Sequence, residues 1–397
     1  MGNRQTQPLE LIYCELSAPG QERMLLVQMY LLPTFFLVVL VLGLPLNLLS
    51  LWVFSRRLKR WTRGTLFLFN LALADASWLL ALPFLVQYHL DSVNWTLGRP
   101  LCTAVRLLYH SYFYLSIFFV TCVSVERYVA IVHPLRAVAL LGRRQACVLC
   151  VAIWAATLAF SSPVAQMTEL QRCPAANHTN RTICTLYVML EDPRESLPFS
   201  LCWSFAGFLL PLAAIAYCCV RSVLEVRRRR GLCNGRGRHL TRLLSAALVL
   251  FALLYLPYHL TRNAAVAVRA LYPRNPEAWQ PASLAFALEM CVCSLNSCVN
   301  PLFSCFVGRR FRREFWGAFA RLCRCASKLS SSETLRDGTR EAEDRAPAAV
   351  CATTAVWAES GEGGGAPAQM RPGEGACSRL PDGALAHSRP GVTHRNC

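Results

Sequence analysis

The sequence predicts an all-α membrane protein, a bundle of seven transmembrane helices with an amphipathic eighth helix. Of its 397 residues, 54% are hydrophobic and only 16% are charged, whereas an average soluble protein carries roughly 25% charged residues. The mean hydropathy is +0.33. A net charge of +18 could indicate a nucleic-acid partner. The basic residues, however, stand in short clusters between long apolar runs, which is typical of a membrane protein and argues against nucleic acid.

Seven apolar stretches are long enough to cross a membrane. A hydrocarbon core about 30 Å thick requires about 20 residues of helix. Each stretch holds few charged residues, and most of these lie near its ends. The expected spans are residues 28–54, 64–90, 101–132, 146–167, 197–220, 240–268 and 282–306. Residues 28–306 are therefore expected to form one membrane domain.

The loops between the spans indicate the orientation. Basic clusters such as "SRRLKRWTR" follow the first, third, fifth and seventh spans, and positive residues stay on the cytoplasmic side. The alternate loops carry glycosylation sequons at Asn177 and Asn180, which are modified outside the cell. A third sequon, at Asn94, lies close to the membrane and is expected to be a poorer acceptor. Both signals predict a multi-pass plasma-membrane protein with residues 1–27 extracellular and the C-terminus cytoplasmic.

The segment after the seventh span has the spacing of a surface helix. Its apolar residues recur every three or four positions, at Phe311, Phe315, Phe319 and Leu322. Because arginines fill the other positions, we expect residues 307–326 to form an amphipathic helix on an anionic membrane leaflet. Cys323 and Cys325 at its end are either palmitoylated or unmodified thiols. Residues 327–397 are rich in Gly, Ser, Pro, Ala and charge, which predicts a disordered cytoplasmic tail.

Several functional classes lack the residues that their chemistry requires. A retinal protein needs a buried lysine amine, and the two lysines of the chain, Lys59 and Lys328, lie outside the spans. Transporters usually show internal repeats, and inspection finds none. No hydrolase or kinase constellation is present, and the Cys and His residues lack the close paired spacing of a zinc site. We therefore expect no catalytic and no metal site of these kinds.

The polar residues inside the spans form an ordered series of motifs. They are "GLPLN" in the first span, "NLALAD" in the second, "SVERYVAIVHP" in the third, Trp154 and Pro163 in the fourth, Pro211 in the fifth, "FALLYLP" in the sixth and "SLNSCVNPLF" in the seventh. This series resembles the rhodopsin-like G-protein-coupled receptors over about residues 31–325. The resemblance implies signalling through heterotrimeric G proteins. It also makes the Ser330–Ser332 cluster a candidate target of receptor kinases and arrestin.

The "ERY" motif is expected to act as a switch at the cytoplasmic end of the third span. Glu126 is an adjacent counter-charge that can hold Arg127, and Tyr128 completes the motif. Release of the arginine to another partner suits a two-state switch. The alternative is an arginine that merely snorkels at a helix end.

Further switch residues are implied deeper in the bundle. Asp75 and Asn300 are polar groups at membrane depth, where such residues are functional by default. In the family they form a sodium and water site, so the resemblance implies an allosteric sodium ion near Asp75, and no other cofactor is expected. Pro301 removes a backbone hydrogen bond and permits bending. Tyr255 takes the place of the aromatic switch residue of the sixth helix.

Two positions depart from the family pattern. A tyrosine is expected three residues after Pro301, where this chain has Ser304. Another is expected eight residues after Pro211, where this chain has Cys219, with Tyr217 nearby. In the family the two phenols lock the active state. Their absence leaves room for an atypical, non-signalling binder or scaffold.

One disulfide is implied by the resemblance. Cys102 matches the half-cystine at the outer end of the third helix, and the following extracellular loop offers Cys173 and Cys184. Cys184 is the expected partner because "NRTIC" resembles the corresponding segment of the relatives. Cys14 and Cys173 then form a candidate second pair.

A cationic site is expected near the outer mouth of the bundle. His259 and Arg262 follow Pro257 in the sixth span, while Arg106 and His110 stand four residues apart in the third. This spacing places the latter two on one helix face. The planar fork of an arginine matches carboxylate or phosphate oxygens. The four side chains together predict a small anionic ligand.

The cationic set resembles the receptors for purinergic nucleotides, succinate and oxoglutarate. This implies an extracellular carboxylate or nucleotide, with Tyr109 also lining the site. The seventh-helix arginine of those relatives is replaced here by Met290. The fifth and seventh spans instead resemble the short-chain fatty-acid receptors, whose arginines are replaced by Ser200 and Phe286. A fatty-acid or lipid ligand is therefore the alternative.

The same residues have a purely structural interpretation. Arg106 and Arg262 would then form rim salt bridges without any ligand, to Glu191, Asp192 or Glu289. His259 would be a packed, hydrogen-bonded histidine. A structure distinguishes these roles by the partners of the two guanidinium groups.

Overall fold

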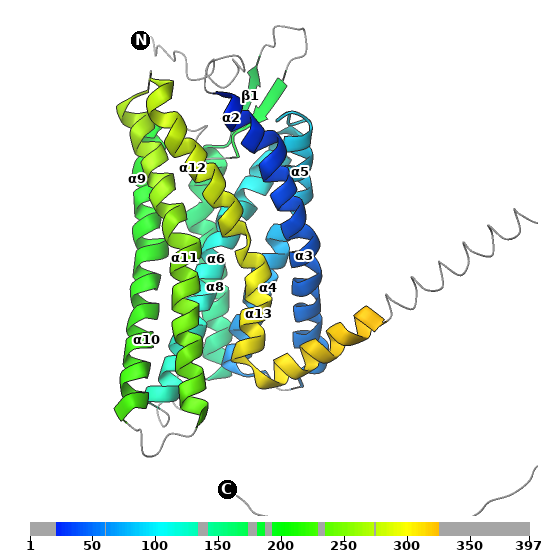
Figure 1. Ribbon diagram of the computed structural model, residues 1–397, viewed down its shortest axis with the longest axis vertical. Helices are drawn as coiled ribbons and strands as arrows, with labels where there is room; N and C mark the ends of the chain where they lie inside the picture. The colour runs from blue at the N-terminus through cyan, green and yellow to red at the C-terminus, as the bar shows by residue number, and fades with distance from the viewer. Residues whose placement is uncertain are drawn as a thin grey trace, which may run out of the picture. The chain divides into compact units, whose positions relative to one another are not determined.

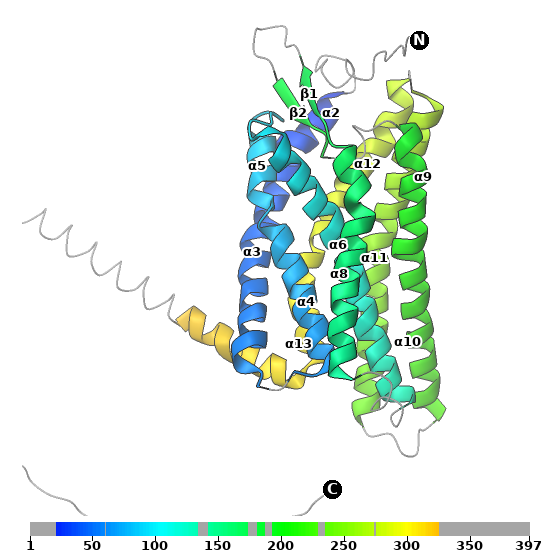
Figure 2. The ribbon, with the colours of Figure 1, turned by 180° about the vertical axis from the view of Figure 1, so that it is seen from behind.

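A computed structural model describes residues 21–59, 61–133, 142–173, 181–186, 193–228, 235–273 and 275–324. Within these residues, seven helical segments are long and apolar enough to cross a membrane. Figures 1 and 2 show them side by side as a bundle. The expected seven-helix membrane fold is confirmed. The expected tail 327–397, the sequons of Asn177 and Asn180, Cys325, and Cys14 of the candidate second disulfide lie outside the described residues.

The first span is a continuous helical rod. It consists of α2 (Gln21–Leu26), η1 (Val27–Leu31), α3 (Leu32–Trp52) and η2 (Val53–Arg57), where η marks wider π-helical turns. Helical structure thus begins at Gln21, inside the segment expected to be the extracellular N-terminus. Large apolar side chains such as Leu37, Val41 and Leu48 are exposed. A helix that is apolar on all sides is typical of a membrane span.

The second and third spans supply much of the bundle interior. The second is α4 (Arg63–Leu79), capped by Thr62, and α5 (Leu82–Leu90). The break between them precedes Pro83 at the start of α5, as expected because proline restricts the residue before it. The third span is the 35-residue helix α6 (Gly98–Val132). Its buried face runs through most of its length, so α6 can place functional side chains in the bundle interior at several depths of the membrane.

The fourth and fifth spans flank a short hairpin. Helix α8 (Arg143–Gln166) is followed by β1 (Leu170–Cys173) and β2 (Arg181–Cys184), which pair antiparallel with Leu170 opposite Cys184. The fifth span comprises α9 (Pro193–Trp203), η4 (Ser204–Leu209) and α10 (Leu210–Arg228). Pro211 has no N–H to donate to Gly207, which accounts for the wider turn of η4 just before it.

The sixth and seventh spans complete the bundle. Helix α11 (Gly235–Leu271) continues through Pro257, whereas the seventh span is divided into α12 (Pro276–Ser294) and α13 (Asn296–Val307). A further helix covers residues 309–324 and crosses beneath the end of α3 (Figures 1 and 2). We call this the opposite end of the bundle, and the end that carries β1 and β2 the hairpin end.

The observed spans extend the expected ones at several ends. The fifth reaches from Pro193 to Arg228, where the apolar pattern alone gave 197–220. The additional turns contain arginines and serines that a count of apolar residues does not include. The sixth membrane segment begins at Leu244, four residues later than expected, although α11 itself starts at Gly235.

Candidate functional site

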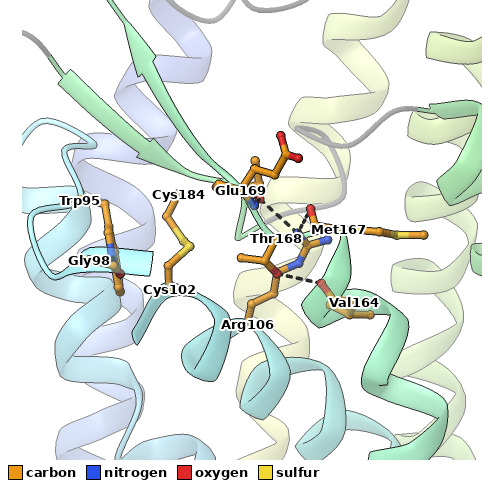
Figure 3. Close-up of a disulfide and its surroundings, with 10 residues drawn as sticks. Trp95, Gly98, Cys102, Arg106, Val164, Met167, Thr168, Glu169 and Cys184 are labelled. Atoms are coloured by element: carbon orange, nitrogen blue, oxygen red, sulfur yellow. Dashed lines mark hydrogen bonds between the residues drawn. A yellow bond between two sulfur atoms is a disulfide. The ribbon is translucent and has the colours of Figure 1, made fainter. Parts of the chain in front are cut away.

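The hairpin end is fastened to the third helix by a disulfide. Cys102, near the start of α6, is bonded to Cys184 at the end of β2 (Figure 3), so the expected pairing is confirmed. The loop before α6 adds two hydrogen bonds to the hairpin. The N–H of Trp95 donates to the carbonyl of Thr182 at 2.7 Å, and the N–H of Thr182 donates to Oδ1 of Asn94 at 3.0 Å.

Arg106 lies one turn further along α6 and is 2% exposed. Its Nη1 donates to the carbonyl oxygen of Met167 at 3.1 Å and to Oγ1 of Thr185 at 3.2 Å. The Thr185 hydroxyl is bonded in turn to the backbone N–H and C=O of Glu169. Figure 3 shows the Glu169 carboxylate turned away from Arg106. Arg106 therefore connects α6 to the chain on both sides of the hairpin.

Arg262 projects from α11 and is 4% exposed. Its Nη1 donates to the phenol oxygen of Tyr114 on α6 at 3.2 Å. The phenols of Tyr258 and Tyr109, which are 3.5 Å apart, are its further electrostatic neighbours. Among the described residues, no carboxylate lies within ion-pair distance of Arg262, and Glu289 is no exception. The rim salt bridge to Glu289 is therefore not formed, and the other two expected partners, Glu191 and Asp192, lie outside the described residues.

The two histidines are each held by a serine. Nδ1 of His110 lies 2.9 Å from Oγ of Ser161 on α8, and Nδ1 of His259 lies 3.0 Å from Oγ of Ser204 in the fifth span. Nε2 of each ring is buried and has no hydrogen-bond partner in the described structure. The expected packed, hydrogen-bonded histidine is therefore formed at Nδ1 of His259, while the contact of these histidines with a ligand stays a prediction.

Aromatic rings surround the four basic side chains. Tyr114 packs against Trp203 with ring centroids 3.9 Å apart, and Gly207 leaves the space for it, since a Cβ there would lie 2.5 Å from Tyr114. The ring of His259 stacks on Phe208 at 4.5 Å. His110 is an electrostatic neighbour of Arg106, Arg262 and His259. The expected residues from the third and sixth spans therefore form one cationic cluster inside an aromatic lining.

The cluster is tightly closed around Arg106. A cavity of only about 10 Å³ adjoins Arg106, Tyr109 and Met290, whereas ligand pockets usually hold about 300–1,000 Å³. This cavity by itself leaves no room for a ligand beside Arg106.

A second group of polar contacts lies deeper in the bundle. Nδ2 of Asn300 donates to Oδ2 of Asp75 at 2.8 Å and to Oγ of Ser116 at 3.0 Å. Asn296 and the Tyr255 hydroxyl also donate to Ser116, at 2.8 and 3.2 Å. Ser116 on the third span thus bonds directly to the sixth and seventh spans, and Asn300 extends the group to Asp75 on the second. Sequence reasoning missed it because a serine in an apolar helix is no signal by itself.

Asn47 compensates for the hydrogen bond that Pro301 cannot make within α13. Pro301 lacks the N–H that would donate to the carbonyl of Ser297 one turn earlier. Nδ2 of Asn47 donates to that carbonyl instead, at 2.8 Å. Asn47 of "GLPLN" therefore supplies the hydrogen bond to Ser297 that Pro301 cannot donate.

The "ERY" residues lie at the opposite end of α6. Nε of Arg127 is 3.0 Å from Oε2 of Glu126, so the two side chains form the ion pair that the sequence suggested. Gly64 at the start of α4 lies against the pair, because a Cβ there would be 2.8 Å from Nη2 of Arg127. Tyr128 contacts Tyr217 on α10 with ring centroids 5.9 Å apart.

The two departures from the family pattern are both buried. Ser304 is 1% exposed, and Sγ of Cys219 lies 3.4 Å from Oγ of Ser245 on α11. Helix 309–324 is anchored by Phe311, which stacks on Phe54 at 4.3 Å. Cys323 at its end is exposed.

Comparison with known proteins agrees with this architecture. The family model described as 7 transmembrane receptor (rhodopsin family) matches residues 46–303. Purinoceptor 1 of Cavia porcellus is 31% identical over 314 residues, 77% of this chain and 80% of the relative. Purinoceptor 1 of Gallus gallus is 30% identical over 291 residues, 72% and 78% of the two chains.

A further relative is purinoceptor 4 of Xenopus laevis, 29% identical over 289 residues. The match covers 71% of this chain and 52% of that relative, so it spans about half of the relative's length.

The seven-helix bundle, its disulfide-bonded hairpin and its buried polar contacts are those of a membrane receptor. The chain belongs to the rhodopsin family of seven-transmembrane receptors. It is accordingly a multi-pass protein of the plasma membrane and a G-protein-coupled receptor, not an enzyme.

Proposed function

We propose that the receptor responds to a small anionic extracellular ligand that carries a carboxylate or a phosphate. The observation that supports this most strongly is the buried guanidinium of Arg262, which has no carboxylate within ion-pair distance among the described residues. Burying a charge without an opposite charge is costly. An anionic ligand would supply that charge at the hairpin end.

Each residue of the cluster has a separate role in this proposal. Arg262 is the charge anchor, and the free Nε2 atoms of His110 and His259 donate or accept hydrogen bonds at the ligand. Arg106 reaches the ligand when it exchanges its contacts with Met167 and Thr185. Tyr109 lines the site beside Tyr258. The relatives are named purinoceptors, so a purine nucleotide is one of the anions to test.

The proposed response is a shift between two arrangements of the bundle. An agonist moves such an equilibrium only if it binds the active arrangement better. The shift would release Arg127 from Glu126 and open a surface for a heterotrimeric G protein. We place the N-terminus outside the cell and helix 309–324 inside it, because the basic clusters lie on the same side as that helix.

A sodium ion near Asp75 belongs to the same proposal. Oδ1 of Asp75 is buried and has no hydrogen-bond partner in the described residues. Sodium is a hard cation, and such ions take oxygen ligands. Oδ1 of Asp75 would hold it, and its presence would favour the arrangement in which Asn300 contacts Asp75 through Oδ2.

Further partners and modifications follow from the proposed orientation. Arrestin and receptor kinases would act at the Ser330–Ser332 cluster, and Cys323 and Cys325 would carry palmitate. Asn177 and Asn180 would carry glycans on the outer side. Asn94 is a poor acceptor because its side chain is already bonded to Thr182.

A second candidate function is a non-signalling binder or scaffold. It is favoured by Ser304 and Cys219, which replace the two phenols that lock the active state in the family. Measurement of basal and ligand-driven nucleotide exchange on a panel of G proteins distinguishes the two. An exchange signal excludes the scaffold, and binding of an acid without any exchange supports it.

The experiment that tests the ligand class is a screen in cells with a promiscuous G-protein reporter. The panel contains purine nucleotides, dicarboxylates, and short- and long-chain fatty acids. Each active compound is paired with a neutral analogue, such as its amide or nucleoside. We expect an acid to be active and its neutral analogue to be inactive. Equal activity of a neutral lipid and its acid would contradict the proposal.

A further inference from the structure

A network of polar side chains joins the fifth span to the sixth beside the cationic cluster. It contains Ser200 on α9, Ser204 in η4, and Asn263 and His259 on α11. Figures 1 and 2 show α9 and α11 side by side. The two serines and His259 are 0%, 6% and 3% exposed. We call these four residues the polar network, of which the proposed function uses only His259.

The distances indicate the direction of the first two hydrogen bonds in the polar network. The hydroxyl of Ser200 donates to Oδ1 of Asn263 at 2.6 Å, and Nδ2 of Asn263 donates to Oγ of Ser204 at 2.9 Å. A separation of 2.6 Å is usual for O–H···O and shorter than the usual N–H···O range, which includes 2.9 Å. The amide of Asn263 therefore turns its oxygen toward Ser200 and its nitrogen toward Ser204.

The hydroxyl of Ser204 links this amide to the ring of His259. A hydroxyl has one hydrogen to donate. Among the described residues, the hydrogen of Ser204 has no acceptor within hydrogen-bond distance other than Nδ1 of His259, 3.0 Å away. If Nδ1 carried a proton instead, Oγ of Ser204 would accept two hydrogen bonds. Its own hydrogen would then be buried without an acceptor, which is costly.

The bond at Nδ1 determines what His259 offers at its other nitrogen. A neutral imidazole carries its proton on one of its two nitrogens, and the partner of one nitrogen decides which. Because Nδ1 accepts from Ser204, the proton is favoured on Nε2. Nε2 is buried and has no hydrogen-bond partner among the described residues. His259 therefore has an unused N–H group at Nε2.

This N–H group belongs to the same part of the bundle as Arg262. The ring of His259 is an electrostatic neighbour of Arg262. It lies 6.1 Å from the ring of Tyr114, whose phenol accepts the hydrogen bond of Arg262. Stacking on Phe208 at 4.5 Å limits the rotation of the imidazole. Arg262 and His259 can therefore donate to one ligand.

We propose that Ser200, Asn263 and Ser204 are positioning residues that keep the proton of His259 on Nε2, so that the ring donates a hydrogen bond to the anionic ligand. The ligand part of this proposal rests on the proposed function and makes it more specific. A guanidinium has donors only, and an ionised carboxylate or phosphate accepts hydrogen bonds without donating any. The polar network thus matches the site to the ionised end of an acid without touching the ligand.

The test observes the proton of His259 in the ligand-free, full-length receptor purified in detergent. The histidine nitrogens are isotope-labelled and recorded by NMR, because a ring nitrogen with a proton and one without a proton resonate far apart. The chain has eight histidines, so the His259→Gln spectrum, which lacks one pair of signals, assigns that pair to His259. We expect Nε2 to carry a proton and Nδ1 to carry none.

Removal of the amide should release the proton from this position. In Asn263→Ala, Oγ of Ser204 no longer accepts from an amide and can accept from Nδ1, so the His259 signals should show both tautomers. Ser204→Thr keeps the hydroxyl and should give the wild-type signals. Thr261→Val is the matched control, because the Thr261 hydroxyl bonds only to the backbone of the same helix. Thermal unfolding of each variant shows that it is folded.

A potency measurement connects the polar network to the ligand. Adenosine diphosphate, succinate, butyrate and palmitate represent the four kinds of acid in the screen. A hydrogen bond changes an equilibrium by about two- to tenfold, so Asn263→Ala should lower the potency of an active acid by that factor, and Thr261→Val should not. If no acid of the screen is active, the proposed function fails, whereas the spectra of the ligand-free receptor still decide where the proton lies.

Three results would overturn the proposal. The first is a proton on Nδ1 of His259 in the wild-type receptor, with or without one on Nε2. The second is an unchanged His259 spectrum in Asn263→Ala, or an equal change in Thr261→Val. The third is wild-type potency of an active acid in Asn263→Ala although both tautomers of His259 are present, which would show that the ring does not donate to the ligand.

Discussion

Arg262 on α11 donates a hydrogen bond to the phenol of Tyr114 on α6 across 3.2 Å. This contact holds a buried guanidinium at the boundary between the third and sixth spans. It also means that an acid bound to Arg262 would act directly on the packing of two helices. The position of α11 relative to α6 is thereby coupled to the proposed ligand.

Replacement of Tyr114 by phenylalanine tests the energetic importance of this contact. A hydrogen bond to a charged group contributes about 1.5–3 kcal/mol, so Tyr114→Phe should lower the thermal unfolding temperature of the purified receptor. Tyr272→Phe, at a tyrosine that is 54% exposed, is the matched control and should leave it unchanged. Equal unfolding temperatures for Tyr114→Phe and the wild type would show that Arg262 has an adequate partner elsewhere.

Thr185→Val should loosen the hairpin end. The hydroxyl of Thr185 accepts a hydrogen bond from Arg106 and is bonded to the backbone of Glu169. Valine has the same shape without these bonds, so amide hydrogen exchange in residues 167–173 and 181–186 should accelerate. Thr185→Ser keeps the hydroxyl and should restore slow exchange. Acceleration in the serine variant as well would point to packing of the methyl group instead.

Ser116→Ala should destabilise the centre of the bundle. Asn296, Asn300 and Tyr255 each donate to the Ser116 hydroxyl, and a buried polar group left without a partner costs about 1–3 kcal/mol. The unfolding temperature should fall. Ser162→Ala is the control, because Ser162 is exposed and bonds only to the backbone of its own helix. An unchanged unfolding temperature in Ser116→Ala would mean that the three donors find other acceptors.

Gly64→Ala should raise basal signalling. The new Cβ would lie 2.8 Å from Nη2 of Arg127 and 3.3 Å from Oε2 of Glu126, so the guanidinium must shift, and we expect this shift to weaken its contact with Glu126. G-protein nucleotide exchange without ligand should increase by about two- to tenfold, since about 1 kcal/mol changes an equilibrium by roughly fivefold. Gly317→Ala adds a methyl group in open space and should have no effect. A fall in basal exchange would instead indicate that the displaced arginine blocks the G-protein surface.

The overall fold could largely be predicted from the sequence, because membrane spans are defined by length and apolarity. The disulfide Cys102–Cys184 could also be predicted, through the resemblance to a family. The ends of the spans could be predicted less well. The turns added at Pro193 and Arg228 are polar, and hydrophobicity alone does not include them. The short strands β1 and β2 left no pattern in so few residues.

The candidate site could be predicted only in part from the sequence. Spacing placed Arg106 and His110 on one face of α6, and the structure buries both of them. Spacing could not show that Arg106 bonds to Met167 and Thr185, because those contacts depend on how the hairpin folds back over the helix. Ser116 was missed for a similar reason. Its importance comes from three donors on two other helices, α11 and α13, which no local pattern records.

The central claim is that Arg262 anchors an acidic ligand, and one measurement tests it most directly. Concentration–response curves for the active acids of the screen are recorded on wild-type, Arg262→Ala and Arg262→Lys receptors at equal surface expression. Loss of a charge-assisted hydrogen bond of about 1.5–3 kcal/mol should reduce potency at least tenfold in Arg262→Ala, with partial recovery in Arg262→Lys. Wild-type potency in Arg262→Ala would contradict the account.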